Sequence, residues 1–236
     1  MTERGAGQVS RAADYFQIGP SNMQWHGQEL VFSCDEIGAP IPRRVRGRVT
    51  VQPNGFANFT TSIDNTGLHR WRPIAPCARV QVEFESPKVS WSGHAYMDSN
   101  EGDEPIDQAF RQWDWARATM ANGDTCVIYD TAPQDGDRRL VAQRFAPSGE
   151  SFGFETPKKY SLKPSAWRVG RNFYSESIDA PQIISTLEDT PFYVRSLIDT
   201  ELLGEKLRAV HESLDIPRLV SLPVRLMLPW RMPRRW

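Results

Sequence analysis

The sequence predicts an all-β fold, built as a barrel or a sandwich of short strands. Residues 44–51 and 79–85 alternate polar and apolar side chains with a period of two, as half-buried strands do. Turn-forming residues separate the apolar stretches at 52–55, 64–67, 121–124, 134–137 and 147–149. No long alternation of strand and helix patterns runs along the chain. Many short strands joined by regular turns are typical of all-β barrels and sandwiches.

The remaining strands follow from short apolar runs between these turns. Trp113, Trp115 and Arg117 alternate with smaller residues, which predicts one strand with both tryptophans on the same face. The other short apolar runs predict strands at 30–32, 125–129, 139–145 and 183–187.

Two regions near the C-terminus are less clear. Residues 202–214 are weakly amphipathic and fit either a helix or strands. The tail, residues 216–236, mixes apolar and arginine residues, and its four prolines keep any helix short. Such a tail predicts either peripheral contact with an anionic membrane or a terminal segment packed on the β-fold.

The composition limits the classes of partner and site. A formal net charge of −1 gives no electrostatic footprint for nucleic acid. Aromatic residues make up 11% of the chain, which suits either a pocket for a large apolar ligand or an aromatic core. Cys34, Cys77 and Cys126 are widely spaced, and the four histidines lack metal-ligand spacing, so we expect neither a disulfide framework nor a metal site.

The apolar runs bear on where the protein resides. They are far shorter than the roughly 20 residues of a membrane span. Residues 1–10 also lack the apolar core of a secretory signal. We therefore expect a cytoplasmic protein, with any attachment to the inner membrane peripheral.

Two short stretches, 68–76 and 91–100, combine ionisable and aromatic side chains. His69 lies two residues from Trp71, and Asp98 lies two residues from Tyr96. In a strand, residues i and i+2 point to the same face, so each pair would present one acid–base group and one aromatic face to a common cavity. Plainer interpretations stay open: Asp98 as a turn cap, His69 as an exposed residue, and the two aromatic residues as core.

Six sequence blocks, in one order along nearly the whole chain, carry a more specific signal. They are residues 1–5, 69–71, 93–100, 110–117, 186–193 and 210–214. Together they resemble the carotenoid 1,2-hydratases, also called hydroxyneurosporene synthases, of bacterial photosynthetic pigment biosynthesis. The resemblance implies a lipocalin-like fold of two β-barrel or sandwich halves, which we place at residues 1–105 and 106–236. Family members usually carry several dozen residues ahead of the stretch that matches Met1, so the first half is expected to be short at its N-terminus.

The resemblance also implies an activity: hydration of acyclic carotenoids such as neurosporene and lycopene at the terminal C1=C2 double bond, without a cofactor. It points to His69, Trp71, Tyr96 and Asp98 as the catalytic positions. From the chemistry we expect a buried Asp98 to protonate C2, because burial raises the pKa of a carboxyl above its usual value of about 3.9. Trp71 and Tyr96 would stabilise the cation at C1, although Tyr96 also suits a hydrogen bond to Asp98.

The remaining predicted roles concern water and the polyene chain. His69 is expected to orient the attacking water as a neutral base. Trp113 and Trp115 are expected to line the tunnel for the polyene. Two other functions stay open: a polyene cyclase or isomerase, and a carotenoid or lipid carrier without catalysis. A carrier gains nothing from a buried acid, whose desolvation is unfavourable.

Overall fold

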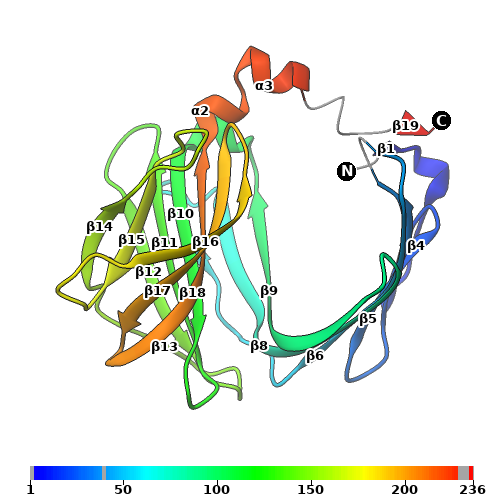
Figure 1. Cartoon of the computed structure of the whole chain (residues 1–236), viewed down its shortest axis with the longest axis horizontal. Helices are drawn as coiled ribbons and strands as arrows, with labels where there is room; N and C mark the ends of the chain where they lie inside the picture. The colour runs from blue at the N-terminus through cyan, green and yellow to red at the C-terminus, as the bar shows by residue number, and fades with distance from the viewer. Residues whose placement is uncertain (1–2, 39–40, 228–233, 236) are drawn as a thin grey trace. The chain divides into compact units, whose positions relative to one another are not determined.

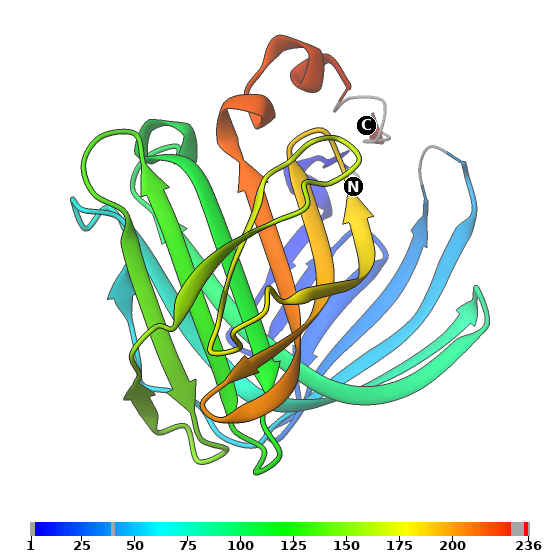
Figure 2. The same cartoon turned by 60° about the vertical axis from the view of Figure 1, so that its left-hand side comes forward.

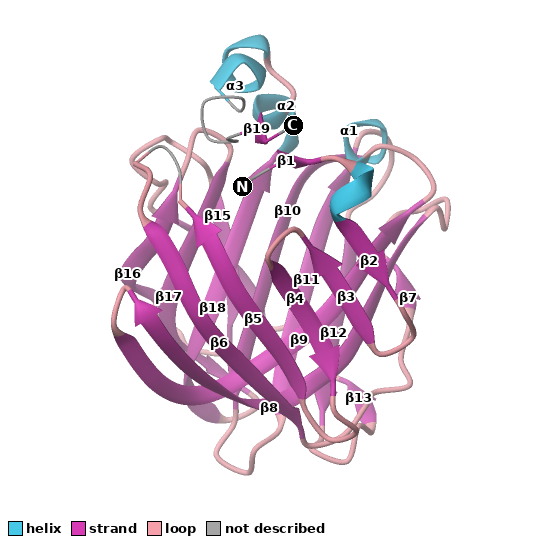
Figure 3. Cartoon of the chain, turned by 90° about the vertical axis from the view of Figure 1, so that its right-hand side faces the viewer, coloured by secondary structure: helices cyan, strands magenta, loops and turns pink. Residues whose placement is uncertain are grey.

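The computed structural model describes residues 3–38, 41–227 and 234–235. It is an all-β protein in which strands dominate and the helices are short, so the predicted fold class is confirmed (Figures 1 and 3). The pairing is antiparallel throughout the larger sheets, and none of the sheets that the described residues form closes on itself. One short parallel pair joins β1 (Glu3–Arg4) to β19 (Arg234–Arg235).

The chain groups into two compact units, each assembled from separate segments. The first consists of Met1–Asn54, Ala78–Tyr96 and Leu222–Trp236, and the second of Gly55–Cys77 and Met97–Ser221. Two long strands, β8 (His69–Ser86) and β9 (Val89–Gly102), contribute residues to both units. The domain division expected after residue 105 stays a prediction, because compact units do not by themselves define parts that fold alone.

The first unit is built on an antiparallel sheet with the strand order β2-β3-β4-β5-β6-β8. Besides β8, its elements are η1 (Ala6–Gln8), β2 (Val9–Arg11), β3 (Tyr15–Ile18), β4 (Ser21–Trp25), β5 (Leu30–Ile37), β6 (Arg44–Pro53) and α3 (Leu222–Met227). The arginine–valine alternation of residues 44–51 lies in β6, as predicted. Gly47 is required where β6 passes Phe84 of β8, because a Cβ at this position would lie 2.5 Å from the Phe84 ring.

The second unit contains a sheet with the strand order β13-β12-β11-β10-β18-β17-β16, whose neighbouring strands lie side by side in Figure 2. Its strands are β10 (Phe110–Thr119), β11 (Thr125–Pro133), β12 (Arg139–Phe145), β13 (Ser151–Gly153), β16 (Gln182–Asp189), β17 (Tyr193–Leu202) and β18 (Glu205–Asp215). The unit also holds β7 (Thr61–Ser62), which pairs with β8, the pair β14 (Lys158–Leu162) and β15 (Arg171–Ser175), and the helices α1 (Ile106–Ala109) and α2 (Ile216–Leu219).

The predicted strands are confirmed at all the positions named above. The predicted turns lie between strands, except that the turn at 52–55 overlaps the last two residues of β6. Gly67 and Gly123 adopt positive φ angles of 81° and 89° in their turns, in the region that favours glycine. The undecided region 202–214 is not helical: β17 ends at Leu202 and β18 occupies Glu205–Asp215.

The two faces of the seven-stranded sheet differ in character. One face packs Ala116, Ile128 and Ile198 into an apolar core with Phe173 of β15. The strand period places Trp113, Trp115 and Tyr129 on the opposite face. We call this opposite face the aromatic face.

A buried charged cluster ties β11 to β14 and β15. The Asp130 carboxylate, 1% exposed, accepts hydrogen bonds from Arg138 Nε at 2.8 Å, Lys159 Nζ at 2.6 Å and the Tyr174 hydroxyl at 2.8 Å. Burial alone would raise the pKa of Asp130, but these three donors hold it below its ordinary value. Arg138, Lys159 and Tyr174 therefore stabilise the charged form of Asp130.

The C-terminal tail forms two short helices, as its prolines predict. Asp215 caps α2 by accepting a hydrogen bond from the Arg218 backbone N–H at 3.1 Å. Residues 228–233 and Trp236, which carry much of the predicted tail, lie outside the described residues. Within the described ranges, no helix has the length and apolar character needed to cross a membrane.

Candidate active site

The loop before β8 is held by one carboxylate. Asp64 accepts hydrogen bonds from the Thr66 hydroxyl and from the backbone N–H groups of Gly67, Leu68 and His69, the last at 3.2 Å. Burial would raise the pKa of Asp64, but the hydrogen bonds from Thr66 and from the backbone hold it below its ordinary value. The carboxylate therefore fixes the point at which His69 enters the strand.

Trp71 and Asp98 meet directly, although 27 residues separate them in the chain. Trp71 is fully buried, and its Nε1–H donates a hydrogen bond of 2.8 Å to Asp98 Oδ2. Asp98 itself is half-buried on β9. The indole thus orients the carboxyl group that the sequence predicts as the acid.

Aromatic side chains surround Trp71 in the second unit. Its ring lies edge-on to Tyr129 at 5.7 Å, to Phe59 at 6.0 Å and to Phe145 at 6.3 Å between centroids. Edge-to-face geometry of this kind is favourable for aromatic pairs and leaves few alternative rotamers. Trp71 is therefore held rigidly on the side where it contacts Asp98.

Tyr129 joins this cluster to the aromatic face. Its hydroxyl donates a hydrogen bond of 3.4 Å to Asn100 Oδ1. Burial raises the pKa of Tyr129 far above its ordinary value, and the negative charges of Asp98 and Glu212 raise it further. Tyr129 is thus a neutral phenol.

The rings of Trp113 and Phe110 connect Tyr129 to His69 through a chain of ring contacts. Trp113 lies 6.3 Å from Tyr129, Phe110 lies 6.0 Å from Trp113, and His69 lies 4.8 Å from Phe110. The imidazole is buried, and its Nε2 is 3.7 Å from Glu104 Oε1. Within the part of the chain that the structure describes, this nitrogen has no hydrogen-bond partner. An unsatisfied buried imidazole nitrogen is well suited to hold a water molecule.

Gly102 closes the other side of the His69 ring. A Cβ at this position would lie 2.6 Å from His69 Nδ1 and 2.7 Å from Cε1. We expect Gly102→Ala to displace the imidazole and to lower the free energy of unfolding by about 1–3 kcal/mol, the usual cost of overpacking. Denaturant unfolding measures the loss. Gly93→Ala, whose Cβ would meet nothing closer than 3.7 Å, is the control. Equal stability of the two variants would contradict the packing described here.

The structure brings together three of the four predicted catalytic residues, His69, Trp71 and Asp98, with Trp113 in the same ring cluster. Tyr96 is half-buried on β9 but belongs to the first unit, so its part in the site stays a prediction. Trp115 is half-buried on the aromatic face, one row from Trp113.

Sequence reasoning missed Asp64, Phe110, Tyr129 and Phe145. Asp64 was visible only as a turn residue. Tyr129 and Phe145 lie in short apolar runs, which mark a strand but do not show what the strand faces. Phe110 belongs to a block that carries the family resemblance, which gave it no role.

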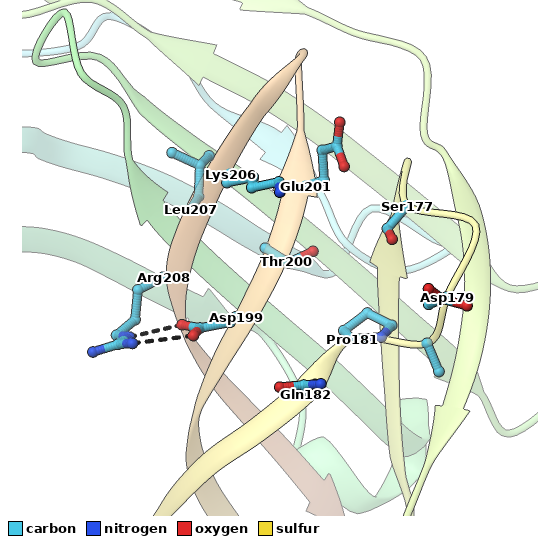
Figure 4. A pocket seen from close by; sticks show the side chains of 11 residues that line it. Ser177, Asp179, Pro181, Gln182, Asp199, Thr200, Glu201, Lys206, Leu207 and Arg208 are labelled. Atoms are coloured by element: carbon cyan, nitrogen blue, oxygen red, sulfur yellow. Dashed lines mark hydrogen bonds and ion pairs between the residues drawn. The ribbon is translucent and has the colours of Figure 1, made fainter.

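One open cavity of the second unit lies away from the predicted site residues. In the second unit, an open cavity of about 560 Å³ is lined by Ser177, Asp179, Asp199, Lys206 and Arg208, among others (Figure 4). Its charged lining does not suit a hydrocarbon, and none of the predicted site residues lines it. Among the described residues there is also no group of three or more His, Cys, Asp or Glu side chains placed to hold a metal ion.

Several known proteins that are similar to this chain carry the same name. The acyclic carotenoid 1,2-hydratase of Rubrivivax gelatinosus is 55% identical over 236 residues, which is 100% of this chain and 58% of the relative. The enzyme of the same name from Thiocapsa roseopersicina is 45% identical over 235 residues, covering 99% of this chain and 58% of the relative. That of Cereibacter sphaeroides is 34% identical over 236 residues, covering 100% of this chain and 84% of the relative.

The chain thus spans 58% of the length of the first two relatives. The profile of the family described as Carotenoid hydratase CrtC matches residues 1–236. The resemblance inferred from the sequence blocks is confirmed, and the chain belongs to the carotenoid hydratase family.

Proposed function

We propose that this chain catalyses the addition of water to the terminal C1=C2 double bond of an acyclic carotenoid, giving a 1-hydroxy-1,2-dihydro product. The observation that carries the proposal is the hydrogen bond of 2.8 Å between Trp71 Nε1 and Asp98 Oδ2 beside a buried aromatic cluster. It places a carboxyl group, the simplest proton donor, against the type of surface that binds a polyene. The names of the relatives support the same reaction.

Asp98 is proposed as the general acid. Its carboxyl proton passes to C2, and the π electrons of the double bond form the new C–H bond, which leaves a tertiary cation at C1. A bound hydrocarbon would exclude water from Asp98 and thereby favour the neutral, proton-carrying carboxyl group. The Trp71 N–H would hold the carboxyl in one orientation during this transfer.

The cation at C1 needs stabilisation that does not trap it. Aromatic faces provide this, and a desolvated cation–π contact contributes about 2 kcal/mol or more. We assign this role to Trp71 and Tyr96. Trp113 and Trp115 are proposed to bind the adjoining polyene through their half-buried indoles.

Water then forms the C–O bond at C1 and passes one proton to the His69 imidazole; solvent takes up this proton and returns one to Asp98 before the next turnover. We propose that His69 holds this water, which agrees with its buried Nε2 lacking a partner among the described residues. Proton, water and alkene balance the reaction without any redox step, so we propose that no cofactor takes part.

The test is turnover of lycopene or neurosporene in detergent and ¹⁸O-labelled water, read by mass spectrometry. We expect a hydrated product that carries the label. Bound carotenoid recovered unchanged would contradict the proposal and favour a carrier. An isomer of unchanged mass would favour a cyclase or isomerase.

The second proposal is that the protein contacts a membrane, because a carotenoid substrate resides there. Helix α3 exposes Leu222 (70%) and Leu226 (62%) beside Arg225, and we propose that it contacts the surface of an anionic inner membrane. Leu226→Asp should reduce co-flotation with anionic vesicles, whereas Ile178→Asp, at a still more exposed site (93%), should not. Equal flotation of both variants would contradict the contact.

A further inference from the structure

The His69 imidazole is enclosed on several sides. The backbone of β9 closes its Nδ1 edge, because a Cβ at Gly102 would lie 2.6 Å from Nδ1. Phe110 covers another flank, with 4.8 Å between the two ring centroids. The His69 side chain is only 4% exposed, so it has almost no contact with bulk water. A proton that His69 takes up during turnover therefore needs another group to carry it out.

Glu104 lies beside the remaining ring nitrogen. It stands between the end of β9 and the start of α1, and its Oε1 is 3.7 Å from His69 Nε2. The Glu104 side chain is 27% exposed. Glu104 is thus close to the buried imidazole and is also open to solvent.

The neighbouring carboxylates are engaged elsewhere. Both oxygens of Asp64 accept hydrogen bonds, from one hydroxyl and from three backbone N–H groups. Asp64 thus binds the backbone of His69 rather than its ring. Asp103 forms two hydrogen bonds with Arg70, at 3.0 and 3.3 Å. Glu104 is the carboxylate that the structure places beside Nε2.

A permanent ion pair explains this contact poorly. The distance of 3.7 Å exceeds that of a hydrogen bond, which spans about 2.7–3.2 Å. An ion pair of this length with a partly exposed partner adds little stability. A shift of about 1 Å in the flexible Glu104 side chain would bring Oε1 within hydrogen-bonding distance of Nε2. The two groups therefore suit a transient transfer of a proton better than a fixed pair.

We propose that Glu104 relays a proton from His69 to solvent between turnovers. This inference rests on the proposed hydration, in which the water that captures C1 passes one proton to His69. The Nε2–H bond of the imidazolium breaks, an O–H bond forms at Glu104 Oε1, and the carboxyl group then gives the proton to bulk water. No redox step is involved. Glu104 acts through His69 and not on the carotenoid, so it affects every turnover except the first.

The test compares the first turnover with the later ones, using Glu104→Gln and lycopene in detergent. With protein in excess over lycopene, we expect the first turnover to stay within about twofold of the rate of the unmodified chain. With lycopene in excess, the steady rate should fall by about 10²-fold, the lower end of the usual effect of a proton-transfer group. A loss of folded structure would slow both phases alike.

A small external carboxylate should replace the missing group. Glu104→Ala leaves space beside His69, and formate should raise the steady hydration rate of this variant by at least about tenfold. Formate should leave the rate of the unmodified chain unchanged, because its own relay is intact.

Glu101→Gln is the matched control. Glu101 lies three residues earlier in the chain, on the exposed surface, where it accepts a hydrogen bond of 3.4 Å from the Ser99 hydroxyl. Both of its phases should match those of the unmodified chain. Steady hydration by Glu104→Gln within about twofold of that chain, equal slowing of its two phases, or no response of Glu104→Ala to formate would each overturn the inference. If the unmodified chain and Glu101→Gln formed no hydrate either, the proposed function itself would fail, and the inference with it.

Discussion

Asp98→Asn is expected to lower the rate of carotenoid hydration by about 10²–10⁴-fold, the usual contribution of a general acid. Asparagine has the same shape and keeps an oxygen for the Trp71 N–H, but it has no acidic proton to give to C2. Carotenoid binding should therefore persist while product formation collapses. Initial rates with lycopene, together with the absorption of the bound carotenoid, measure both quantities.

Asp103→Asn is the control for this variant. Asp103 lies five residues further along, is largely exposed, and pairs with Arg70 Nη1 at 3.0 Å. This substitution also replaces a carboxyl group by an amide but does not touch Trp71, so the hydration rate should stay near that of the unmodified chain. Hydration by Asp98→Asn at the rate of Asp103→Asn would remove Asp98 from its proposed role.

Asp130→Asn is expected to lower the free energy of unfolding by about 1.5–3 kcal/mol, the usual contribution of hydrogen bonds to a charged group, because it removes the charge partner of Lys159 and leaves Arg138 with its longer pair to Asp114 at 3.8 Å. Denaturant unfolding at neutral pH measures the loss. Asp199→Asn, which breaks an exposed pair, should change stability little. Similar midpoints for the two variants would contradict the cluster.

The same cluster predicts a dependence on pH. The pKa of Asp130 in the folded protein lies below its ordinary value of 3.8, so its stabilisation is complete above that value and is lost as the pH falls through the folded-state pKa. The stability gap between the unmodified chain and Asp130→Asn should therefore narrow below pH 3.8. A gap that stays constant down to the lowest pH at which the protein remains folded would contradict this.

The sequence predicts the strands well where polar and apolar residues alternate cleanly, as in 44–51 and 79–85. It leaves 202–214 undecided for a physical reason. The buried face of β18 carries Leu207 and Ala209 but also His211 and Ser213, which are buried among polar partners such as Asp114 and Asn172. Because His211 and Ser213 are polar, the sequence alone does not mark them as buried. The alternation of buried and exposed residues along β18 is therefore not visible as an alternation of apolar and polar residues.

The candidate site is predictable only in part. The i, i+2 spacings of His69 with Trp71 and of Tyr96 with Asp98 follow from the strand period alone, and the resemblance to a known family points to the same four positions. The contact between Trp71 and Asp98 depends on the placement of two separate strands. Such pairings are set by the whole fold, so no local pattern reveals the contact between Trp71 and Tyr129.

The central claim is that an exchangeable acid protonates C2 before water adds to C1. The most direct measurement is the position of deuterium, by NMR, in the hydrated carotenoid formed in D₂O. Because the Asp98 carboxyl exchanges with solvent, we predict one deuterium on C2 and none elsewhere along the chain of the product. A hydrated product without deuterium at C2 would contradict the account.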